Sequence, residues 1–347
     1  MLAIVLAGGF GTRLHPLTLT TPKQMLPVAG RPMIEHIVST LSEHGVDKIV
    51  LSLGYRDDVF RAAYPDYRCA GVELVYAVET KPLGTAGAIR FAWEIAGKPR
   101  ESFLVVNGDV ITALDFTALM RCHSSTGAEA TIHLIMVDDP SRYGLVLADS
   151  AGKVGRFLEK PHNSASGHCG IATTFEEGGW INAGSYVMEP AVIDRIPADQ
   201  DVSIERDCFP SMACEDSLWS LPQQVYWIDA GTPESYLQVQ LDILESKYST
   251  AVQGCAPHIA EGVSVGAGAR VERSVIMGGV SVGAGARVER SVIMENAIIS
   301  DRALICDSAV GSAAFVGVET KVSDFTLLAD NAKAEANRNL TTSAGNC

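Results

Sequence analysis

The sequence predicts two folds in succession, a doubly wound α/β sheet and then a parallel β-helix. Two observations carry this prediction. Short aliphatic runs alternate with amphipathic segments in the first part of the chain, and a 17-residue repeat follows. The composition changes at the same place, because the only aromatic residues after position 250 are Phe315 and Phe325. We therefore predict an α/β domain over residues 1–247, a β-helix over 258–326 and a polar tail over 327–347.

The elements of the first domain alternate along the chain. Short apolar runs predict buried strands, which we place at Leu2–Leu6, Lys48–Ser52, Val72–Val78 and Phe103–Val106. Apolar residues at helical spacing predict helices, which we place at Pro32–His44, Thr85–Ala96 and Phe116–His123. Because strands and helices alternate with short connections, we expect a parallel, doubly wound sheet that binds ligands beyond the carboxyl ends of its strands.

The second part of the chain repeats itself. The segment GVSVGAGARVERSVIM occurs at 262–277 and again at 279–294. At the same 17-residue offset the sequence gives three columns in which every member is Ile or Val: Ile259, Ile276, Ile293 and Val310; Val265, Val282, Ile299 and Val316; Val271, Val288, Ile305 and Val322. Such spacing is typical of a hexapeptide β-helix, whose stacked strands each point an aliphatic side chain inward. The segment resembles the left-handed hexapeptide β-helices.

The composition excludes several classes of function. The net charge is −14, whereas proteins that bind nucleic acid regardless of its sequence need an excess of Lys and Arg. No run of 18 apolar residues is present, so we expect no membrane span, and the chain opens on a strand-like run without a basic leader. The eight cysteines are scattered and form no CxxC pair. We therefore expect reduced thiols, no zinc site and a cytoplasmic protein.

A glycine-rich loop follows the first predicted strand, in the sequence LAGGFGTRL. Glycine allows backbone N–H groups to approach an anion closely, and Arg13 adds a charged fork. The loop is not the dinucleotide-binding motif GxGxxG, because Leu14 stands where the third glycine belongs. It is not a Walker loop either, because no Gly-Lys-Ser/Thr follows.

Residues 8–36, GGFGTRLHPLTLTTPKQMLPVAGRPMIEH, resemble the signature GGxGTRLxPLTxxxPKxxxPVxxxPxI of the sugar-phosphate nucleotidyltransferases. The resemblance continues over nearly all of residues 1–245. It implies a Rossmann-like mixed sheet and the transfer of a nucleoside monophosphate from an NTP to a sugar 1-phosphate, with release of pyrophosphate. It also implies that Arg13 binds the departing pyrophosphate, that Lys23 lies near the phosphates, and that the loop binds the nucleotide through Leu6, Ala7, Gly8, Gly9, Gly11 and Thr12.

Two carboxylates stand at predicted strand ends. Asp109 follows the buried run in FLVVNGD, and Asp229 lies in VYWIDAGTP. Mg²⁺ prefers one or two carboxylates together with phosphate oxygens, although an Asp in such a place also commonly caps a helix. The resemblance implies that both residues meet at one Mg²⁺ ion and that Asp109 is catalytic.

The resemblance also implies which residues meet the acceptor. The motifs YG, EKP and NAG would bind the sugar phosphate, and Lys160 would hold its attacking phosphate; their residues are Tyr143, Gly144, Glu159, Lys160, Asn182 and Gly184. Residues 161–180 form a polar, Gly-rich insert that is longer than the family pattern. This insert is either a surface loop or a part of the acceptor pocket.

The loop ETKPLGTAG, residues 79–87, bears on the choice of base. It resembles the guanylyltransferase branch, which implies that Glu79, Gly84 and Thr85 bind the nucleotide. A carboxylate can accept both neighbouring donors of guanine, whereas uracil and thymine present a donor beside acceptors and suit an amide. Glu79 could equally be a surface residue at a strand end. Gln24 and His15, moreover, resemble the thymidylyltransferases.

Within the family the chain most resembles the bacterial mannose-1-phosphate guanylyltransferases, with further matches in VIDRIP at 192–197 and VSIER at 202–206. This favours GTP and mannose 1-phosphate as substrates. Two alternatives keep the chemistry and change a substrate. One is a cyclitol phosphate such as valienol 1-phosphate with GTP, and the other is glucose 1-phosphate with dTTP or UTP.

Two other classes of function stay open. Hexapeptide helices occur in acyltransferases, which generally use a catalytic histidine on the helix, but His258 is the only histidine after residue 247. A regulatory paralogue that binds an NDP-sugar without turnover would usually lack part of the phosphate and metal set, which is complete in this sequence. The open coil end and the Val/Ile-rich sides of the helix predict a homo-oligomer formed through the β-helix, with no nucleic-acid or membrane partner.

Overall fold

The computed structural model describes residues 1–54, 56–160, 178–249 and 259–342. Their contacts divide the chain into two compact units. Unit 1 comprises Met1–Gly9 and Ile37–Trp227, and unit 2 comprises Phe10–His36 and Ile228–Cys347. The predicted domain boundary, at residues 247 to 258, falls largely outside the described residues. Most of the predicted insert at 161–180 also lies outside them.

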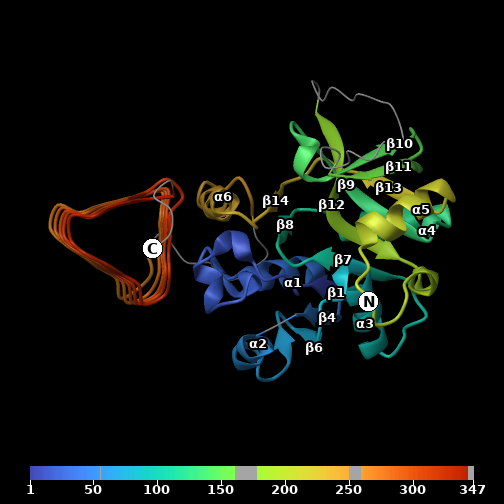
Figure 1. Ribbon diagram of the computed structural model, residues 1–347, viewed down its shortest axis with the longest axis horizontal. Coiled ribbons are helices and arrows are strands. Elements are labelled where there is room, and N and C mark those ends of the chain that lie inside the picture. The colour runs from blue at the N-terminus through green and yellow to red at the C-terminus, as the bar shows by residue number, and fades with distance from the viewer. Residues whose placement is uncertain (55, 161–177, 250–258, 343–347) are drawn as a thin grey trace. The chain divides into compact units, whose positions relative to one another are not determined.

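Unit 1 is built on one mixed sheet (Figure 1). Its main path runs in the order β11-β10-β12-β7-β1-β4-β6-β5, and β9 and β13 branch from β12. The strands of this sheet are β1 (Leu2–Leu6), β4 (Lys48–Leu53), β5 (Arg68–Cys69), β6 (Val72–Val78), β7 (Phe103–Asn107), β9 (Ala130–Val137), β10 (Gly144–Ala148), β11 (Val154–Glu159), β12 (Gly179–Met188) and β13 (Leu218–Pro222). Strand β8 (Val110–Thr112) lies outside this sheet. The helices and short helical turns of this unit are α2 (Asp57–Ala63), α3 (Gly84–Ile95), α4 (Phe116–Thr126), η4 (Pro140–Arg142), η6 (Pro190–Arg195), η7 (Ile204–Cys208) and α5 (Phe209–Cys214).

The predicted α/β sheet is confirmed, with strand and helix ends that differ by at most a few residues. Strands β7, β1, β4 and β6 are parallel neighbours, and their carboxyl ends share one edge of the sheet. The sheet is mixed because β12 runs antiparallel to β7, β9 and β10. A fully buried core of aliphatic and aromatic side chains lies behind these strands, with Ile4, Val105 and Tyr186 among its members.

Sequence patterns did not predict α2 or the strands from β9 to β13. The segment of α2 has one buried residue, Phe60, so it carries little of the apolar periodicity that marks a helix. Strand β9 is buried on both faces over most of its length and therefore lacks the alternation that marks a half-buried strand.

Unit 2 begins with a compact segment before the β-helix. It contains η1 (Thr12–Leu14), η2 (Leu17–Leu19), η3 (Lys23–Met25), β2 (Pro27–Val28) and β3 (Arg31–Pro32), and later α6 (Pro233–Leu244). Helix α1 (Met33–Glu43) starts in unit 2 and ends in unit 1, and β14 (Trp227–Asp229) likewise crosses the boundary. The Tyr236 hydroxyl and the Gln240 amide of α6 both donate to the Pro27 carbonyl oxygen, at 2.7 and 2.8 Å, which fixes this segment to the helix.

The β-helix consists of three parallel sheets whose strands recur from coil to coil, and its section is triangular in Figure 1. One sheet contains β15 (Ser264–Val265), β18 (Ser281–Val282), β21 (Ile298–Ile299), β24 (Phe315–Val316) and β27 (Lys333–Ala334). The second contains β16 (Arg270–Glu272), β19 (Arg287–Glu289), β22 (Leu304–Cys306), β25 (Lys321–Ser323) and β28 (Asn339–Thr341). The third contains β17 (Val275–Ile276), β20 (Val292–Ile293), β23 (Ala309–Val310) and β26 (Leu327–Leu328).

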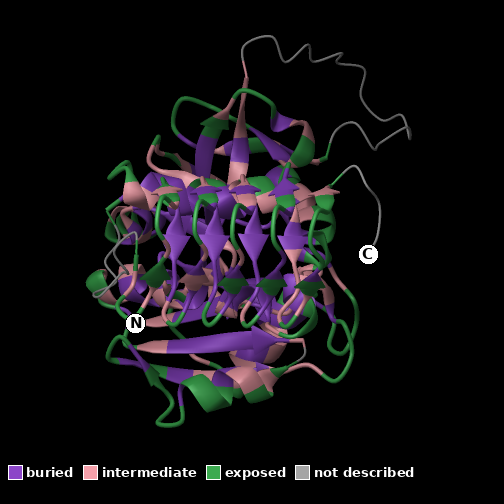
Figure 2. Cartoon of the chain, turned by 90° about the vertical axis from the view of Figure 1, so that its left-hand side faces the viewer, coloured by how far each residue is buried: buried purple, intermediate pink, exposed green. Residues whose placement is uncertain are grey.

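The predicted aliphatic columns form the interior of this β-helix. Figure 2 shows buried residues at the same place in successive coils. In one column the exposed fraction falls from 46% at Val265, in the first coil, to 2% at Val282 and 0% at Val316. Seventeen residues therefore make up one coil. Stacking of the coils buries each aliphatic side chain against the next.

The predicted end of the β-helix at residue 326 is wrong. Strands β26, β27 and β28 continue the three sheets as far as Thr341, so residues 327–342 are not a polar tail. The last coil pairs at an offset of 18 residues, for example Val316 with Ala334, because one additional residue stands at Asp324–Phe325, where both φ angles are positive. The 17-residue columns therefore lost their register at this point. Residues 343–347 of the predicted tail lie outside the described residues.

Over the described part of the chain, no helix combines the length and the apolar character needed to cross a membrane.

Candidate functional site

The glycine-rich loop leaves β1 at the carboxyl edge of the sheet. Its backbone continues beside β4 past the end of the strand, because the Ala7 N–H donates to the Ser52 carbonyl oxygen at 2.9 Å. Gly8 then passes directly against Gly54, where a Cβ on Gly54 would lie 2.5 Å from the Gly8 carbonyl oxygen. Gly9 is exposed, and a Cβ at this position would meet nothing within 4 Å. The loop therefore leaves an open edge for a ligand beyond β1.

The next turn belongs to unit 2 and requires glycine. Gly11 has a φ of +63°, and a Cβ there would lie 3.0 Å from the Thr18 Cγ2 and 3.2 Å from the Lys23 Cβ. The Thr18 hydroxyl donates to the Gly11 carbonyl oxygen at 2.8 Å, which fixes the turn. Lys23, in η3, is only 7% exposed. The turn thus places Thr12 and Arg13 next to a buried lysine.

Arg13 lies beside Asp229. Its Nη2 is 4.0 Å from the Asp229 Oδ2, and the other oxygen of that carboxylate accepts a hydrogen bond from the Gly231 N–H at 2.9 Å. A Cβ on Gly231 would lie 2.8 Å from the Arg13 Nη2 and 2.7 Å from the Asp229 Oδ1. Glycine at this position therefore provides the room for both groups. The Arg13 side chain is 60% exposed, so its guanidinium is accessible to an anion.

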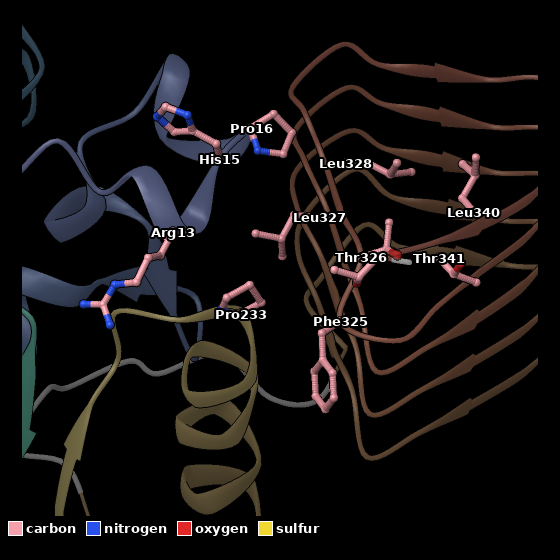
Figure 3. Close-up of a pocket in the computed structure, with 11 residues that line it drawn as sticks. Arg13, His15, Pro16, Pro233, Phe325, Thr326, Leu327, Leu328, Leu340 and Thr341 are labelled. Atoms are coloured by element: carbon pink, nitrogen blue, oxygen red, sulfur yellow. The ribbon is translucent and has the colours of Figure 1, made fainter. Parts of the chain in front are cut away.

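Arg13 also borders a cavity of about 420 Å³ within unit 2. The other lining residues come from the η1–η2 segment, the start of α6 and the last coils of the β-helix, namely His15, Pro16, Pro233, Phe325, Thr326, Leu327, Leu328, Leu340, Thr341 and Thr342. Figure 3 shows that the Arg13 guanidinium points away from the β-helix residues that line this cavity. Arg13 therefore borders this cavity without pointing its guanidinium toward the β-helix.

Glu79 directly follows β6 in unit 1. Its Oε1 accepts from the Ser52 hydroxyl at 3.0 Å, and its Oε2 accepts from the Leu83 N–H at 3.2 Å. A Cβ on Gly8 would lie 3.7 Å from the Glu79 Oε1, so this carboxylate lies next to the glycine-rich loop. Burial raises the pKa of the Glu79 carboxyl above its ordinary value, and the two hydrogen bonds partly offset this. The Glu79 carboxylate is half-buried and accepts two hydrogen bonds, which argues against Glu79 being only a surface residue.

Thr85 and Gly84 stand at the start of α3 and contact protein groups. The Thr85 hydroxyl donates to the Glu205 Oε2 at 2.7 Å and accepts from the Ile204 N–H at 2.8 Å. Gly84 has a φ of +67°, and a Cβ there would lie 2.5 Å from the Val202 carbonyl oxygen. The sequence predicts that both residues bind the nucleotide, whereas the structure shows them fixing α3 to the segment around residue 202.

Strands β10 and β11 bring the YG and EKP motifs together, because Gly144 pairs with Glu159. The Lys160 N–H donates to the Tyr143 carbonyl oxygen at 3.2 Å, and the Lys160 Nζ lies 3.4 Å from the Glu159 Oε1. A Cβ on Gly144 would lie 2.9 Å from the Glu159 Oε2, so glycine is required where this carboxylate crosses β10. Burial raises the pKa of the Glu159 carboxyl, and the neighbouring Lys160 opposes the shift.

The NAG motif forms a break in β12. The strand shifts register between Asn182 and Tyr186, and Gly184 between them has a φ of +75°. The Asn182 side chain spans the break, because it accepts from the Gly184 N–H at 3.0 Å and donates to the Tyr186 hydroxyl at 2.9 Å. A Cβ on Gly184 would lie 2.6 Å from the Asn107 Nδ2, at the end of β7. The break therefore lies against the strand end that leads to Asp109.

Asp109 lies in the same corner of unit 1. Tyr186 is fully buried, and its pKa is raised well above the ordinary value by burial and then by the negative charges of Glu205, Glu159 and Asp109. The three carboxylates thus act electrostatically on one buried phenol. Asp109 stands two residues after the end of β7 at Asn107, the residue that lies against Gly184 of the NAG motif.

Asp109 and Asp229 are the two carboxylates that the sequence analysis assigns to a divalent metal ion. Among the described residues, no group of three or more His, Cys, Asp and Glu side chains could hold a metal. Asp109 in unit 1 and Asp229 in unit 2 are both partly exposed, and Asp229 has one oxygen committed to the Gly231 N–H. Mg²⁺ usually takes one or two carboxylates and completes its shell with water and phosphate oxygens. Each of the two side chains, taken by itself, is thus a chemically suitable ligand for such an ion.

Sequence reasoning missed two residues of this site. Glu205 links Thr85 to the acceptor corner, and the only signal was its place in VSIER, a motif to which no role was given. Trp227 lies edge-on to Tyr143 with ring centroids 5.6 Å apart, and its Nε1 donates to the Ala183 carbonyl oxygen at 2.9 Å. Its position two residues before Asp229 was the available signal.

Comparisons with known proteins agree with this arrangement. The nucleotidyl transferase family matches residues 2–246, and the GMPPB C-terminal domain matches residues 257–343. A probable mannose-1-phosphate guanylyltransferase 1 of Oryza sativa subsp. japonica is 36% identical, over 95% of this chain and 91% of that protein. The mannose-1-phosphate guanylyltransferase of Mycobacterium tuberculosis is 36% identical, over 80% of this chain and 74% of that protein.

A solved structure supports the same fold. HddC from Yersinia pseudotuberculosis, complexed with GMP-PN, is 28% identical and matches with a TM-score of 0.56. The match covers 70% of this chain and 99% of that one. The family match runs from β1 to α6. It therefore covers the motifs of unit 1 and also Arg13 in η1 of unit 2. The chain belongs to the nucleotidyl transferase family.

Proposed function

We propose that this chain transfers GMP from GTP to mannose 1-phosphate and releases GDP-mannose and pyrophosphate. The reaction class follows from the family, and relatives named mannose-1-phosphate guanylyltransferase support the choice of substrates. The observation that carries the choice of base is the Glu79 carboxylate, which Ser52 and Leu83 hold beside the glycine-rich loop. An acceptor-only carboxylate pairs with the N1–H and the 2-amino group of guanine.

The chain's own side chains position the reactants and neutralise their charge. The attacking phosphate is already an anion, so no general base is required. In this proposal Lys160 holds that phosphate, Arg13 binds the departing pyrophosphate, and Lys23 stabilises the phosphates of the nucleotide. The backbone of Leu6–Gly9, Gly11 and Thr12 would bind the nucleotide. The exposed guanidinium of Arg13 and its neighbour Asp229 support this assignment.

The remaining motif residues hold the sugar and the ion. Glu159, Asn182 and Gly184 would bind the sugar beside Tyr143 and Gly144. Asp109 and Asp229 would hold Mg²⁺, which when bound neutralises phosphate charge and orients the phosphate oxygens.

We also propose a cytoplasmic location and a homo-oligomer. The five cysteines among the described residues are free thiols, as expected in a reducing compartment: Cys69, Cys122, Cys208, Cys214 and Cys306. The β-helix exposes 48% of Ile298 and 39% of Phe315, which are neighbours on its outer face, and such a pair is suited to a protein partner.

The test is an initial-rate assay of pyrophosphate release from GTP, Mg²⁺ and mannose 1-phosphate, with GDP-mannose identified by mass. We expect turnover by the wild-type chain. In Asp109→Asn we expect a rate at least about 10²-fold lower, because a carboxylate that would hold Mg²⁺ at the phosphates is lost. An Asp109→Asn enzyme with near wild-type turnover would remove Asp109 from the proposed site. Stoichiometric GDP-mannose binding without any turnover would instead indicate the regulatory paralogue.

A further inference from the structure

The hydroxyl of Thr85 joins two distant segments of unit 1. It donates to the Glu205 Oε2 at 2.7 Å and accepts from the Ile204 N–H at 2.8 Å. The two side chains are 120 residues apart in the sequence. A hydroxyl has one hydrogen to donate, and the Thr85 hydroxyl donates it in a hydrogen bond to the Glu205 carboxylate. Thr85 therefore holds η7 against the start of α3.

The backbone around Thr85 closes tightly on the same segment. The Ala86 N–H donates to the Val202 carbonyl oxygen at 2.8 Å, and the Val202 N–H donates to the Leu83 carbonyl oxygen at 2.9 Å. The Leu83 N–H in turn donates to the Glu79 Oε2 at 3.2 Å. Any displacement of η7 relative to α3 therefore moves the residue that fixes the base-reading carboxylate.

On its other side η7 meets the acceptor corner, the name we give to the YG, EKP and NAG motifs around Glu159. Segment η7 packs against β11, which carries Glu159, as well as against α3. The charge of Glu205 raises the pKa of both the Tyr186 phenol and the Glu159 carboxyl, in agreement with this packing. Ser203 also donates to the Glu205 Oε2, at 2.8 Å, which holds the carboxylate in one orientation.

We propose that Glu205 is a positioning residue that couples the two substrate subsites, holding the base-reading loop through Thr85 and the acceptor corner through η7. The proposal rests on the proposed function, because it assigns GTP to one side of η7 and the sugar phosphate to the other. Occupation of one subsite then fixes η7 and favours occupation of the other. Thr85 acts through Glu205 and does not itself need to touch the nucleotide.

The test is a double-mutant cycle on the full-length chain with Thr85→Val, Glu205→Ala, which removes the acceptor, and the double variant. Thr85→Ser is the matched control, because it keeps the hydroxyl. We expect Thr85→Val to raise the KM values for both GTP and mannose 1-phosphate about tenfold, with a smaller change in kcat. Thr85→Ser should stay within about twofold of the wild type. The double variant should be no worse than Glu205→Ala alone, because the Thr85–Glu205 hydrogen bond is lost in both.

Three results would overturn the proposal. If Thr85→Val raised the KM for GTP alone, and Glu205→Ala added its own full effect in the double variant, Thr85 would bind the nucleotide directly. A lower melting temperature with both KM values unchanged would show that the link is only structural. Wild-type kinetics in Thr85→Val would show that the link between Thr85 and Glu205 affects the binding of neither substrate.

Failure of the proposed function gives a different result, because the wild-type chain then fails with GTP and mannose 1-phosphate before any variant is compared. In that case the same variants are compared on the NTP and sugar phosphate that do react. Without any turnover they are compared by calorimetric binding of GDP-mannose, which spans both subsites. We expect Thr85→Val, but not Thr85→Ser, to weaken that binding about tenfold or more. Equal binding by both variants, or no binding by the wild-type chain, would overturn the coupling.

Discussion

At the scale of single residues, Glu79 connects the chemistry of the base to the fold. Its carboxylate is held by the Ser52 hydroxyl and the Leu83 N–H, and it accepts from both. Both oxygens keep a free lone pair in this arrangement, since each has taken one hydrogen bond. A ligand that offers two neighbouring donors can therefore bind without displacing either protein partner.

The first prediction concerns Glu79→Gln. We expect kcat/KM for GTP to fall about 10²-fold, because the amide places a donor against one of the two donors of guanine. The values for dTTP or UTP should stay level or rise. The measurement is pyrophosphate release with each NTP at a fixed acceptor concentration. An equal loss with every NTP would show that Glu79 supports the loop without reading the base.

The second prediction is a pH dependence with the same origin. Burial raises the pKa of the Glu79 carboxyl above the ordinary value of 4.5, so it takes up a proton before an exposed glutamate does as the pH falls. The protonated form cannot accept both donors of guanine. We expect kcat/KM for GTP to fall as the pH decreases toward this raised pKa, and the fall to be absent in Glu79→Gln. Identical acid limbs in both proteins would assign the titration to another group.

The third prediction concerns Arg13→Ala. The guanidinium is 60% exposed beside Asp229, so its removal should cost little stability. We expect kcat to fall about 10²- to 10³-fold, because a positive charge is lost where the pyrophosphate departs. Single-turnover kinetics and thermal unfolding measure the two effects separately. A large drop in melting temperature with normal kcat would give Arg13 a structural role only.

Much of the site was predictable residue by residue, because its members follow strand ends or occupy a strict motif. Asp109 follows β7, Glu159 ends β11, and Gly184 stands at the break in β12. The link between Thr85 and Glu205 was not predictable, because it joins groups 120 residues apart. A single sequence carries no sign of which distant hydroxyl a carboxylate will meet.

At the scale of elements, the β-helix shows what a period can and cannot predict. The 17-residue columns correctly placed the inward residues from Ile276 to Val322, all fully or almost fully buried. They failed after Asp324, because one extra residue with a positive φ changed the offset to 18. In the α/β part, the amphipathic helices and the short parallel strands were predictable. Strand β9 was not, since burial on both faces removes its alternation.

The fourth prediction concerns Ile305→Ala in β22. Ile305 is fully buried in the middle of the β-helix, and each coil stabilises only its neighbours. We expect a loss of about 2–5 kcal/mol from the free energy of unfolding, through lost burial and a residual cavity. Denaturant unfolding measures it, and Leu304→Ala, at the partly exposed neighbouring position, is the control. Equal effects at both positions would contradict the inward assignment of Ile305.

At the scale of the whole molecule, the fifth prediction is self-association. The exposed pair Ile298 and Phe315 forms an apolar patch across two coils of the outer face. We expect multi-angle light scattering to give an oligomer for the wild-type chain and a smaller species for Ile298→Lys/Phe315→Lys. Ser264→Lys, in the same column but two coils away, is the control. A wild-type monomer would contradict the prediction.

The account as a whole depends on one pairing, a guanine nucleotide with a hexose phosphate on one active surface. The most direct measurement crosses GTP, ATP, CTP, UTP and dTTP with mannose, glucose and cyclitol 1-phosphates and records kcat/KM from pyrophosphate release in the presence of Mg²⁺. The account predicts the highest value for GTP with mannose 1-phosphate. A higher value for dTTP with glucose 1-phosphate would contradict the role of Glu79 and transfer the choice of base to residues such as Gln24.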